Sequence, residues 1–90
     1  MRLKGHTGVL FDSRFIKRKG MDGISILTVS DDRSIRCWDL NLDGGTYNQS
    51  LELYGHRSRV WTARQCQGSD GIPLIASVSE DSTCKIWAMN

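Results

Sequence analysis

The sequence predicts an all-β fold made of two consecutive copies of one small unit. The first observation behind this prediction is an internal repeat, because the pattern of His6, Asp32 and Trp38 returns about 50 residues later. The second is that short runs of β-branched and aromatic residues recur between turn-forming residues, whereas no segment sustains the 3.6-residue period of a helix. Repeats of this length are typical of architectures assembled from stacked units, such as blades or solenoids.

The first copy contains four predicted strands. They cover residues 9–16, 24–30, 34–40 and 49–54, and they are separated by a loop over 17–23, a tight turn at 31–33 and a loop over 41–48. The strands are rich in Val, Ile, Phe and Thr, and they end at stretches of Gly and Asp, which interrupt strands. Apolar residues occupy both faces of 24–30, so we expect this strand to be covered on both sides.

The second copy repeats three of these strands. They cover residues 59–66, 74–79 and 83–89, with a loop over 67–73, and the printed sequence ends before a fourth strand. We therefore expect two units, 1–54 and 55–90, with residues 1–4 as the tail of a preceding outer strand. The second unit is expected to lack its fourth strand.

The composition excludes several classes of protein. The chain has 90 residues, with 12 basic and 10 acidic side chains, so its net charge alone indicates neither nucleic-acid nor membrane binding. The three cysteines have no metal or redox spacing, which favours a reducing compartment. No apolar run is long enough to cross a membrane, and the first residues do not resemble a signal peptide. We expect a cytoplasmic protein without a cofactor or a membrane contact.

Residues at matching positions in both copies carry a resemblance to a known family. Each copy opens with Gly-His and has Ser-x-Asp before its third strand, and this strand contains Trp38-Asp39 in the first copy and Trp87-Ala88 in the second. This pattern resembles the WD-repeat family, whose units are blades of β-propellers. The resemblance covers essentially the whole chain and departs at Ala88, where the family usually has Asp. It implies two propeller blades, the second incomplete.

The resemblance also implies a hydrogen-bond relay in each blade. In the family, Trp donates to a Ser hydroxyl, Ser meets the His of the Gly-His turn, and Asp accepts from that His. The residues implied are His6, Ser30, Asp32 and Trp38 in the first copy, and His56, Ser79, Asp81 and Trp87 in the second. Gly5 and Gly55 fit a tight turn, where Gly adopts backbone angles that a Cβ forbids.

Ser, His and Asp are also the components of a hydrolase triad, so catalysis by Ser30 or Ser79 is an alternative. Two observations favour a structural role: the same residues occur twice at matching spacing, and a Trp accompanies them each time. The sequence also lacks a G-x-S-x-G motif and Gly-rich phosphate loops. We therefore expect no enzyme activity, no metal site and no small-molecule substrate.

A binding surface is the remaining candidate site. In propellers the Gly-His turn and the turn before the last Trp lie on one rim, which would gather the basic residues Lys4, Arg33, Arg57 and Arg59. Arginine binds phosphate or carboxylate in a bidentate manner, so RNA or an acidic protein segment would suit this rim. The alternative is that these arginines neutralise Asp31 and Glu80. Trp61 is expected either to fill a gap between the blades or to project into the central channel.

The second copy shows a finer resemblance. The strings Gly-His-x-x-Arg-Val-Trp at 55–61 and Glu-Asp-x-x-Cys at 80–84 resemble WD-repeat subunits that are non-catalytic partners of a tRNA ribose 2′-O-methyltransferase acting in the anticodon loop. This resemblance implies a scaffold that binds a methyltransferase, with tRNA as a second candidate partner. The alternative function is a generic protein-interaction propeller, such as an adaptor in ubiquitin ligation or signalling, with no role in RNA modification.

The length conflicts with an independent propeller. Propellers have about four to eight blades, and stacked repeats need neighbours to bury their apolar faces. Two blades would leave two such faces open. We therefore expect the chain to be a fragment of a larger propeller, or to assemble with other copies.

Overall fold

The computed structural model describes residues 1–17 and 23–89, and these form an all-β fold of seven strands. Within these residues there is no helix that could span a membrane. The strands are β1 (Leu10–Ile16), β2 (Ile24–Ser30), β3 (Ser34–Asn41), β4 (Thr46–Tyr54), β5 (Val60–Gln67), β6 (Pro73–Ser79) and β7 (Cys84–Ala88).

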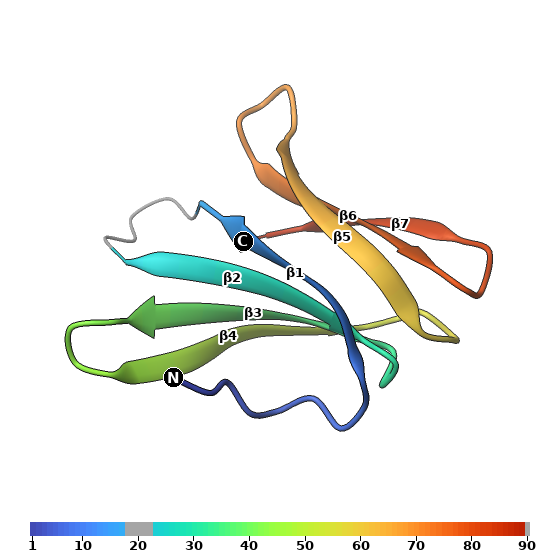
Figure 1. The fold of residues 1–90 in the computed structure, drawn as a ribbon. Helices are drawn as coiled ribbons and strands as arrows, with labels where there is room; N and C mark the ends of the chain where they lie inside the picture. The colour runs from blue at the N-terminus through green and yellow to red at the C-terminus, as the bar shows by residue number, and fades with distance from the viewer. Residues whose placement is uncertain (18–22, 90) are drawn as a thin grey trace.

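The first sheet is an antiparallel meander in the order β1-β2-β3-β4 (Figure 1). Each strand pairs with the next along the chain, and the register places Ile26 opposite both Phe15 and Trp38. A bulge between Leu10 and Asp12 shifts the start of β1, and a second irregularity lies between Cys37 and Trp38. Short turns between consecutive strands favour this arrangement, since antiparallel neighbours need no crossover.

The second sheet repeats the first three strands in the order β5-β6-β7. Its bulge, between Val60 and Thr62, corresponds to the bulge in β1. Among the described residues no strand pairs with the outer edge of β7, in contrast to β3, which is covered by β4.

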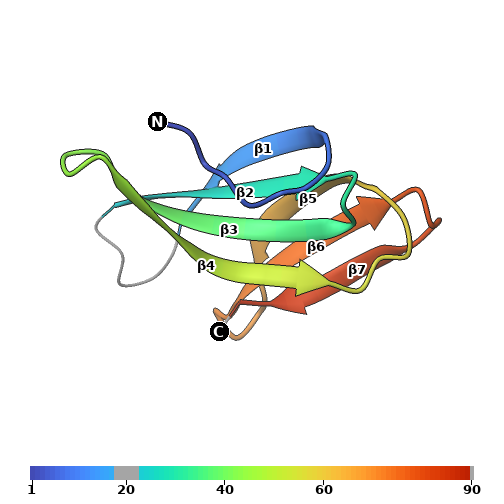
Figure 2. The same ribbon diagram turned by 90° about the horizontal axis from the view of Figure 1, so that it is seen from below.

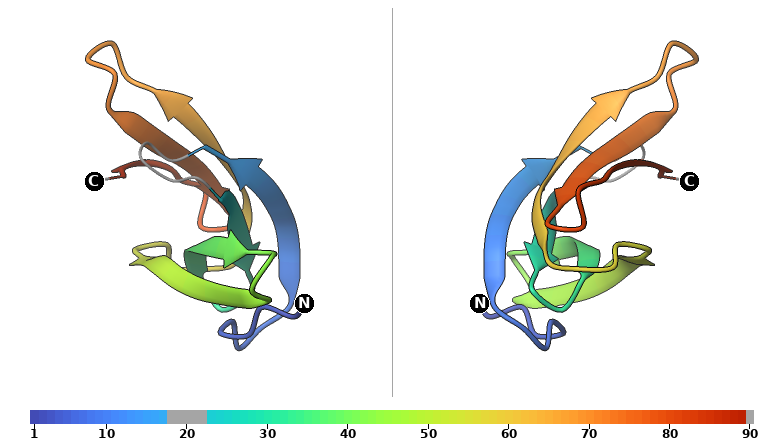
Figure 3. Two further views of the ribbon diagram at one scale, coloured as in Figure 1. Left: turned by 90° about the vertical axis from the view of Figure 1, so that its left-hand side faces the viewer. Right: turned by 90° about the vertical axis from the view of Figure 1, so that its right-hand side faces the viewer.

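The two sheets pack face to face through β5, which contacts β1, β2 and β3 (Figures 2 and 3). The buried core between them is formed by Ile16, Leu27, Val29, Ile35 and Cys37 of the first sheet, and by Val60, Ala63, Ile75 and Met89 of the second part of the chain. Leu27, Val29, Ile35 and Cys37 alternate along β2 and β3, so they share one face of the first sheet.

The strands agree with the sequence prediction except at their ends. The largest difference is β4, which begins at Thr46, three residues earlier than expected. The predicted loop over 41–48 is therefore wrong: Gly45 adopts φ +66°, and this left-handed residue closes a short hairpin. Residues 1–4 form no strand in the structure. Most of the predicted loop over 17–23 lies outside the described residues.

Candidate functional site

The site begins with a hydrogen-bond relay in the first sheet. Trp38 Nε1 donates to Thr28 Oγ1 at 2.8 Å, and Thr28 Oγ1 lies 2.7 Å from His6 Nε2. His6 Nδ1 lies 2.9 Å from Asp32 Oδ2. The carboxylate can only accept, so His6 carries its proton on Nδ1 and its Nε2 accepts from Thr28. Every buried side-chain polar atom among the described residues has a partner, as low-dielectric surroundings require.

The second sheet repeats this relay. Trp87 Nε1 donates to Ser77 Oγ at 2.9 Å, Ser77 Oγ lies 2.7 Å from His56 Nε2, and His56 Nδ1 lies 3.0 Å from Asp81 Oδ2. The Trp rings also explain the glycines of the Gly-His pairs. A Cβ on Gly5 would lie 2.8 Å from Trp38 Cη2, and one on Gly55 would lie 2.7 Å from Trp87 Cη2.

Gly5 and Gly55 are therefore required by close contact with a ring. The expected reason, a backbone angle that only Gly adopts, does not apply here, because among the described residues the glycines with positive φ are Gly45 and Gly71.

Ser30 and Ser79 do not occupy the expected place in the relays, and this is a correction to the sequence prediction. Trp38 pairs with Ile26 on β2, and its indole reaches Thr28, two residues further along the strand. Ser30 lies about 7 Å beyond Thr28, since a strand rises about 3.3 Å per residue. Its Oγ instead accepts the backbone N–H of Asp32 at 3.1 Å. Ser79 makes the same bond to Asp81 at 3.1 Å.

The structure also adds two hydroxyls that the sequence reasoning missed. Ser34 Oγ donates to Asp32 Oδ1, and Thr83 Oγ1 donates to Asp81 Oδ1 in the same way. Ser34 and Thr83 follow the Asp by two residues in each copy, and Thr28 and Ser77 also match between copies. A hydroxyl at the same position of both copies marks all four residues, but it marks Ser30 and Ser79 as well, so it gives candidates without selecting among them.

These bonds fix the charges of the relay. Burial lowers the pKa of the His6 imidazole, against the opposing effect of Asp32, so His6 stays neutral more readily than a free histidine. Burial raises the pKa of the Asp32 carboxyl, but hydrogen bonds from Ser34, His6 and Thr7 outweigh burial and hold this pKa well below its usual range. The hydrogen bond from Thr83 is the main cause of the similarly lowered pKa of Asp81.

Each relay links a hydroxyl, a His and an Asp in the same order as a hydrolase triad. The hydroxyl, however, is buried and already bonded within the sheet. Ser77 is 0% exposed, and its Oγ already accepts from Trp87 while it contacts His56. A substrate carbonyl therefore has no approach to this oxygen. Ser30 and Ser79 are also buried, and their oxygens bond to backbone groups in the adjacent turns. This geometry favours the structural role over catalysis.

The relays position a surface that we call the turn rim, formed by residues 5–8, 31–33, 55–59 and 80–82 at one end of both sheets. Asp81 Oδ2 accepts the backbone N–H of Arg57 at 2.8 Å, so the relay fixes the backbone of this arginine. Arg33 lies in the turn after Asp32 with φ +72°. Arg33, Arg57 and Lys4 are exposed and form no ion pair with any described residue.

Arg59 is different because it is paired. Its Nε lies 3.0 Å from Asp31 Oδ1 and 2.7 Å from Glu80 Oε2, so it joins the first sheet to the second. Trp61 is next to it and contacts Phe11 of the first sheet, with ring centroids 4.9 Å apart. Trp61 thus lies in the gap between the sheets, although 43% of its surface is exposed.

Ala88 stands where the family usually has Asp, and the residue opposite it on β6 also differs from its counterpart in the first sheet. In the first sheet Asp39 is opposite Ser25 and accepts its hydroxyl at 2.7 Å. In the second sheet the corresponding pair is Ala88 opposite Leu74. Both members of the polar pair are therefore replaced by apolar residues, so no polar group loses its partner.

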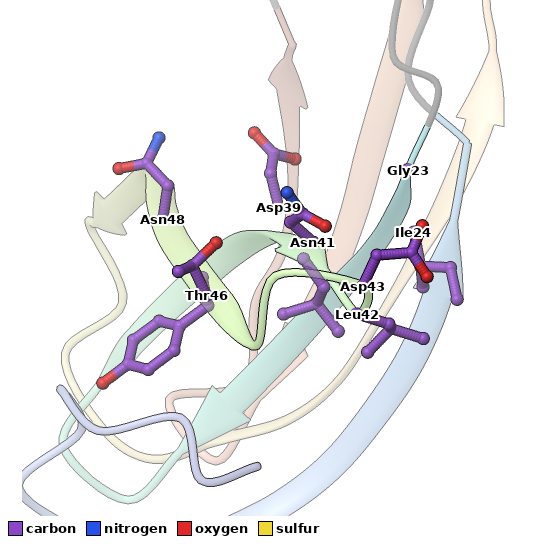
Figure 4. A pocket seen from close by; sticks show the side chains of 10 residues that line it. Gly23, Ile24, Asp39, Asn41, Leu42, Asp43, Thr46 and Asn48 are labelled. Carbon is purple, nitrogen blue, oxygen red and sulfur yellow. The ribbon is translucent and has the colours of Figure 1, made fainter.

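A cavity lies at the opposite end of the first sheet, around the β3–β4 hairpin (Figure 4). Asp39, Asn41, Asp43, Thr46 and Asn48 supply its polar lining, together with apolar side chains such as Ile24 and Leu42. The relays and the turn rim contribute no residue to it. No group of three or more metal-ligating side chains is present among the described residues.

Comparison with known proteins agrees with this geometry. The family model described as WD domain, G-beta repeat matches residues 1–39 and 47–88, which together span most of the chain. Two antiparallel sheets, each with a Trp-hydroxyl-His-Asp relay, define repeat blades of the propeller type. The chain belongs to the WD-repeat family.

Individual relatives come from proteins of different names. The chain is 31% identical over 90 residues to the tRNA (34-2'-O)-methyltransferase regulator WDR6 of Homo sapiens, and 32% identical to the protein of that name in Mus musculus. It is 36% identical over 93 residues to the nuclear distribution protein PAC1 of Arthroderma benhamiae. These matches cover 97% to 98% of the chain, but the chain spans 7% of the WDR6 proteins and 19% of PAC1.

Proposed function

We propose that this chain is part of a non-catalytic WD-repeat scaffold that assists ribose 2′-O-methylation in the tRNA anticodon loop. The similarity to WDR6, a methyltransferase regulator by name, over 97% of the chain carries this proposal. A separate methyltransferase would supply the methyl donor and the chemistry, and the chain would bind that enzyme in the cytoplasm. The turn rim would contact tRNA.

Two arginines on the turn rim suit a phosphate backbone. Arg33 and Arg57 are exposed and have no acidic partner among the described residues, so their guanidinium groups are available to an incoming anion. Their backbones belong to turns that Asp32 and Asp81 hold through hydrogen bonds. Unpaired guanidinium groups on a fixed backbone can bind phosphate through bidentate, charge-assisted hydrogen bonds.

The test in cells measures 2′-O-methylated nucleosides in the anticodon loop of total tRNA by mass spectrometry. Cells that lack the parent gene are compared with cells that carry the wild-type gene, an Arg33→Ala/Arg57→Ala variant, or an Arg64→Ala variant. Arg64 is an exposed arginine in β5, about 13 Å along the strand from Val60, and serves as the control for lost charge. We expect the mark to disappear without the gene and to decrease with the double variant. Unchanged methylation in the deletion would refute the proposed function.

Direct binding of tRNA provides a second measurement. We expect the affinity of the purified chain for tRNA to fall steeply between 50 and 200 mM salt, because phosphate contacts release counterions. Loss of two phosphate contacts should reduce the slope of log K against log salt by about 1.4 to 1.8. Arg33→Ala/Arg57→Ala should show this reduction and Arg64→Ala should not. Binding without salt dependence would exclude the turn rim as an RNA surface.

The second candidate function is a protein-interaction propeller without a role in tRNA. It is favoured by the 36% identity to PAC1, which covers 98% of the chain. Under this alternative, methylation is unchanged when the gene is deleted, and the turn rim binds an acidic protein segment in place of RNA.

Microscopy of the tagged parent protein tests the cytoplasmic location that we propose for both functions.

A further inference from the structure

One arginine on the turn rim is held by aromatic rings and carboxylates, in contrast to Arg33 and Arg57. The guanidinium carbon of Arg59 lies 5.9 Å from the ring centroid of Phe11 and 5.7 Å from that of Trp61. Its Nε contacts Asp31 at 3.0 Å and Glu80 at 2.7 Å. Aromatic faces attract a cation, and two carboxylates suit a planar guanidinium because it forms bidentate, charge-assisted hydrogen bonds.

The four residues around Arg59 come from equivalent positions of the two sheets. Phe11 and Trp61 both lie at the bulge of an inner strand, and Asp31 and Glu80 both follow the last Ser of β2 or β6. The backbone N–H of Asp31 donates to Val9 at 2.8 Å, and that of Glu80 donates to Arg59 at 3.0 Å. The fold therefore builds this cluster from one aromatic ring and one acid of each sheet. The side chain of Arg59 occupies the cluster but does not form it.

The cluster is open to solvent and has an excess of negative charge. The side chains of Arg59, Asp31 and Glu80 are 43%, 44% and 50% exposed. Two carboxylates face one guanidinium, so the cluster retains a net negative charge. A half-exposed arginine exchanges readily between such a site and water, because exposed ion pairs contribute little to stability. A second guanidinium can therefore compete for the same contacts.

We propose that Phe11, Trp61, Asp31 and Glu80 form an arginine-binding site, and that Arg59 occupies it until an arginine side chain of a protein partner displaces it. The partner's guanidinium would take the contacts that Arg59 shows: cation–π contact with the two rings and ion pairs with the two acids. Val9 and Leu10 are exposed next to the site, so an apolar residue beside the partner arginine would find apolar surface. The site recognises a protein segment, and the proposal does not rest on the role in tRNA methylation.

The resident arginine sets the expected affinity. When a site is free for only a fraction of the time, the apparent dissociation constant increases by the inverse of that fraction. If Arg59 occupies the site for about 90% of the time, its removal should tighten the binding of an external arginine about tenfold. This expectation is opposite to that for an arginine that contacts the partner itself, whose removal would weaken binding.

The test uses the full 90-residue chain and a capped peptide, Ala-Leu-Arg-Leu-Ala, titrated by isothermal calorimetry. Peptides with citrulline or lysine in place of arginine are matched controls, because citrulline removes the charge and lysine removes the planar group. We expect Arg59→Ala to bind the arginine peptide about tenfold more tightly than the wild type. Adding Asp31→Asn/Glu80→Gln to Arg59→Ala should abolish the increase in affinity for the arginine peptide. Arg64→Ala should bind this peptide as the wild type does. Citrulline should abolish binding, and lysine should weaken it.

Circular dichroism and thermal melting show whether each variant keeps its fold. If Arg59→Ala unfolds, Arg59→Gln removes the charge while retaining much of the side chain's packing, and the same gain is expected. Equal or weaker binding of the arginine peptide to a folded Arg59 variant overturns the proposal. Equal binding of the arginine and citrulline peptides also overturns it. Neither outcome depends on the tRNA measurements, so the two proposals fail independently.

Discussion

The indole N–H of Trp38 reaches Thr28 Oγ1 at 2.8 Å, and this bond connects the outer half of the first sheet to the Gly-His turn. Thr28 is 6% exposed and accepts from Trp38 while it donates to His6. One hydroxyl therefore satisfies two buried groups. The second sheet uses Ser77 in the same position, which shows that the hydroxyl is required and the methyl group of threonine is not.

Replacement of Thr28 by Val should destabilise the chain by about 2 to 6 kcal/mol, because two buried polar groups lose their partner. Val keeps the shape of Thr but removes the hydroxyl, so Trp38 Nε1 and His6 Nε2 both lose their partner, at about 1 to 3 kcal/mol for each buried group. Thr28→Ser retains the hydroxyl and should cost less than about 1.5 kcal/mol, because it removes one methyl group. Urea unfolding at pH 8 measures both variants.

Ser30→Ala tests whether Ser30 belongs to the relay, as the sequence predicted, or lies outside it, as the structure shows. Ser30 accepts the backbone N–H of Asp32 at 3.1 Å, so its loss leaves a single partly buried donor in the turn. We expect a cost of about 1 kcal/mol. An effect of Ser30→Ala equal to that of Thr28→Val would contradict the relay as the structure shows it.

The fold could be predicted from the sequence because its strands are short and separated by strong turn residues. β2 was predicted with its observed ends, since Gly23 and Asp31 interrupt the apolar run on either side. β4 was predicted too short, because Thr46 and Tyr47 follow two glycines and are exposed. The sequence around the hairpin does not show how tightly Gly44 and Gly45 close it.

The site was predicted less completely, for a geometric reason. His, Asp and Trp are rare enough for their spacing to identify them, whereas each copy offers several hydroxyls along β2 or β6. Ser30 and Thr28 lie on the same face of β2, and their distance from Trp38 depends on the strand register. A register shift of two residues leaves the face unchanged, so alternation of polar and apolar residues could not distinguish them. The pairing of Arg59 with Asp31 and Glu80 is the alternative that the sequence offered for the rim arginines. The sequence could not tell which arginine forms these pairs, because that depends on contact between the sheets.

Acidification should destabilise the chain first through His6. The pKa of His6 is lowered by folding, so below its ordinary value of 6.5 the unfolded chain binds a proton more readily than the folded chain. Stability from this group is complete well above pH 6.5 and is lost as the pH falls through 6.5. The slope reaches at most about 1.4 kcal/mol per pH unit for one proton.

Urea unfolding between pH 8 and pH 3 measures this effect, with His6→Gln as the reference. The variant should be less stable at pH 8 but should lose less stability on acidification than the wild type. A further loss is expected in both proteins as the pH falls through 3.8, because the pKa values of Asp32 and Asp81 are lowered in the folded state. Identical pH dependence of the two proteins above pH 5 would exclude His6 as the titrating group.

Arg33→Gly and Arg33→Ala should differ in stability although they remove the same charge. Arg33 has φ +72°, a conformation that is unfavourable for residues with a Cβ. Gly adopts this angle without that cost, so the Gly variant should be more stable than the Ala variant by roughly 1 kcal/mol despite the greater entropy of its unfolded chain. Thermal melting measures the difference.

The same pair of variants tests the turn rim. Because both lack the guanidinium, both should bind tRNA equally weakly, whatever their stability. If affinity followed stability, with the Gly variant binding more tightly, the effect of Arg33 on tRNA would come from the turn conformation and not from charge.

The chain should associate head to tail in solution, because each sheet leaves one apolar face open. Cys37 and Val29 are 0% and 1% exposed where the second sheet covers them, whereas Ile86 and Val78, at the equivalent positions of the second sheet, are 61% and 40% exposed. On the other face of the first sheet Phe15 is 77% exposed. A second copy that places its Phe15 face on the Ile86 face repeats the packing already present within the chain. Sedimentation velocity should therefore show mass that increases with concentration.

Two substitutions distinguish this contact from a symmetric one. Phe15→Asp blocks one face and Ile86→Asp blocks the other, so each variant alone should be monomeric, because a head-to-tail contact needs one face of each kind. An equimolar mixture should form 1:1 dimers, since the Ile86 face remains intact in the first variant and the Phe15 face in the second. If the two Ile86 faces paired with each other, the Phe15→Asp variant alone would dimerise. Adding the Ile86→Asp variant would then produce no further dimer. A wild-type chain that remained monomeric at all concentrations would contradict this prediction, because both apolar faces would then stay exposed to water.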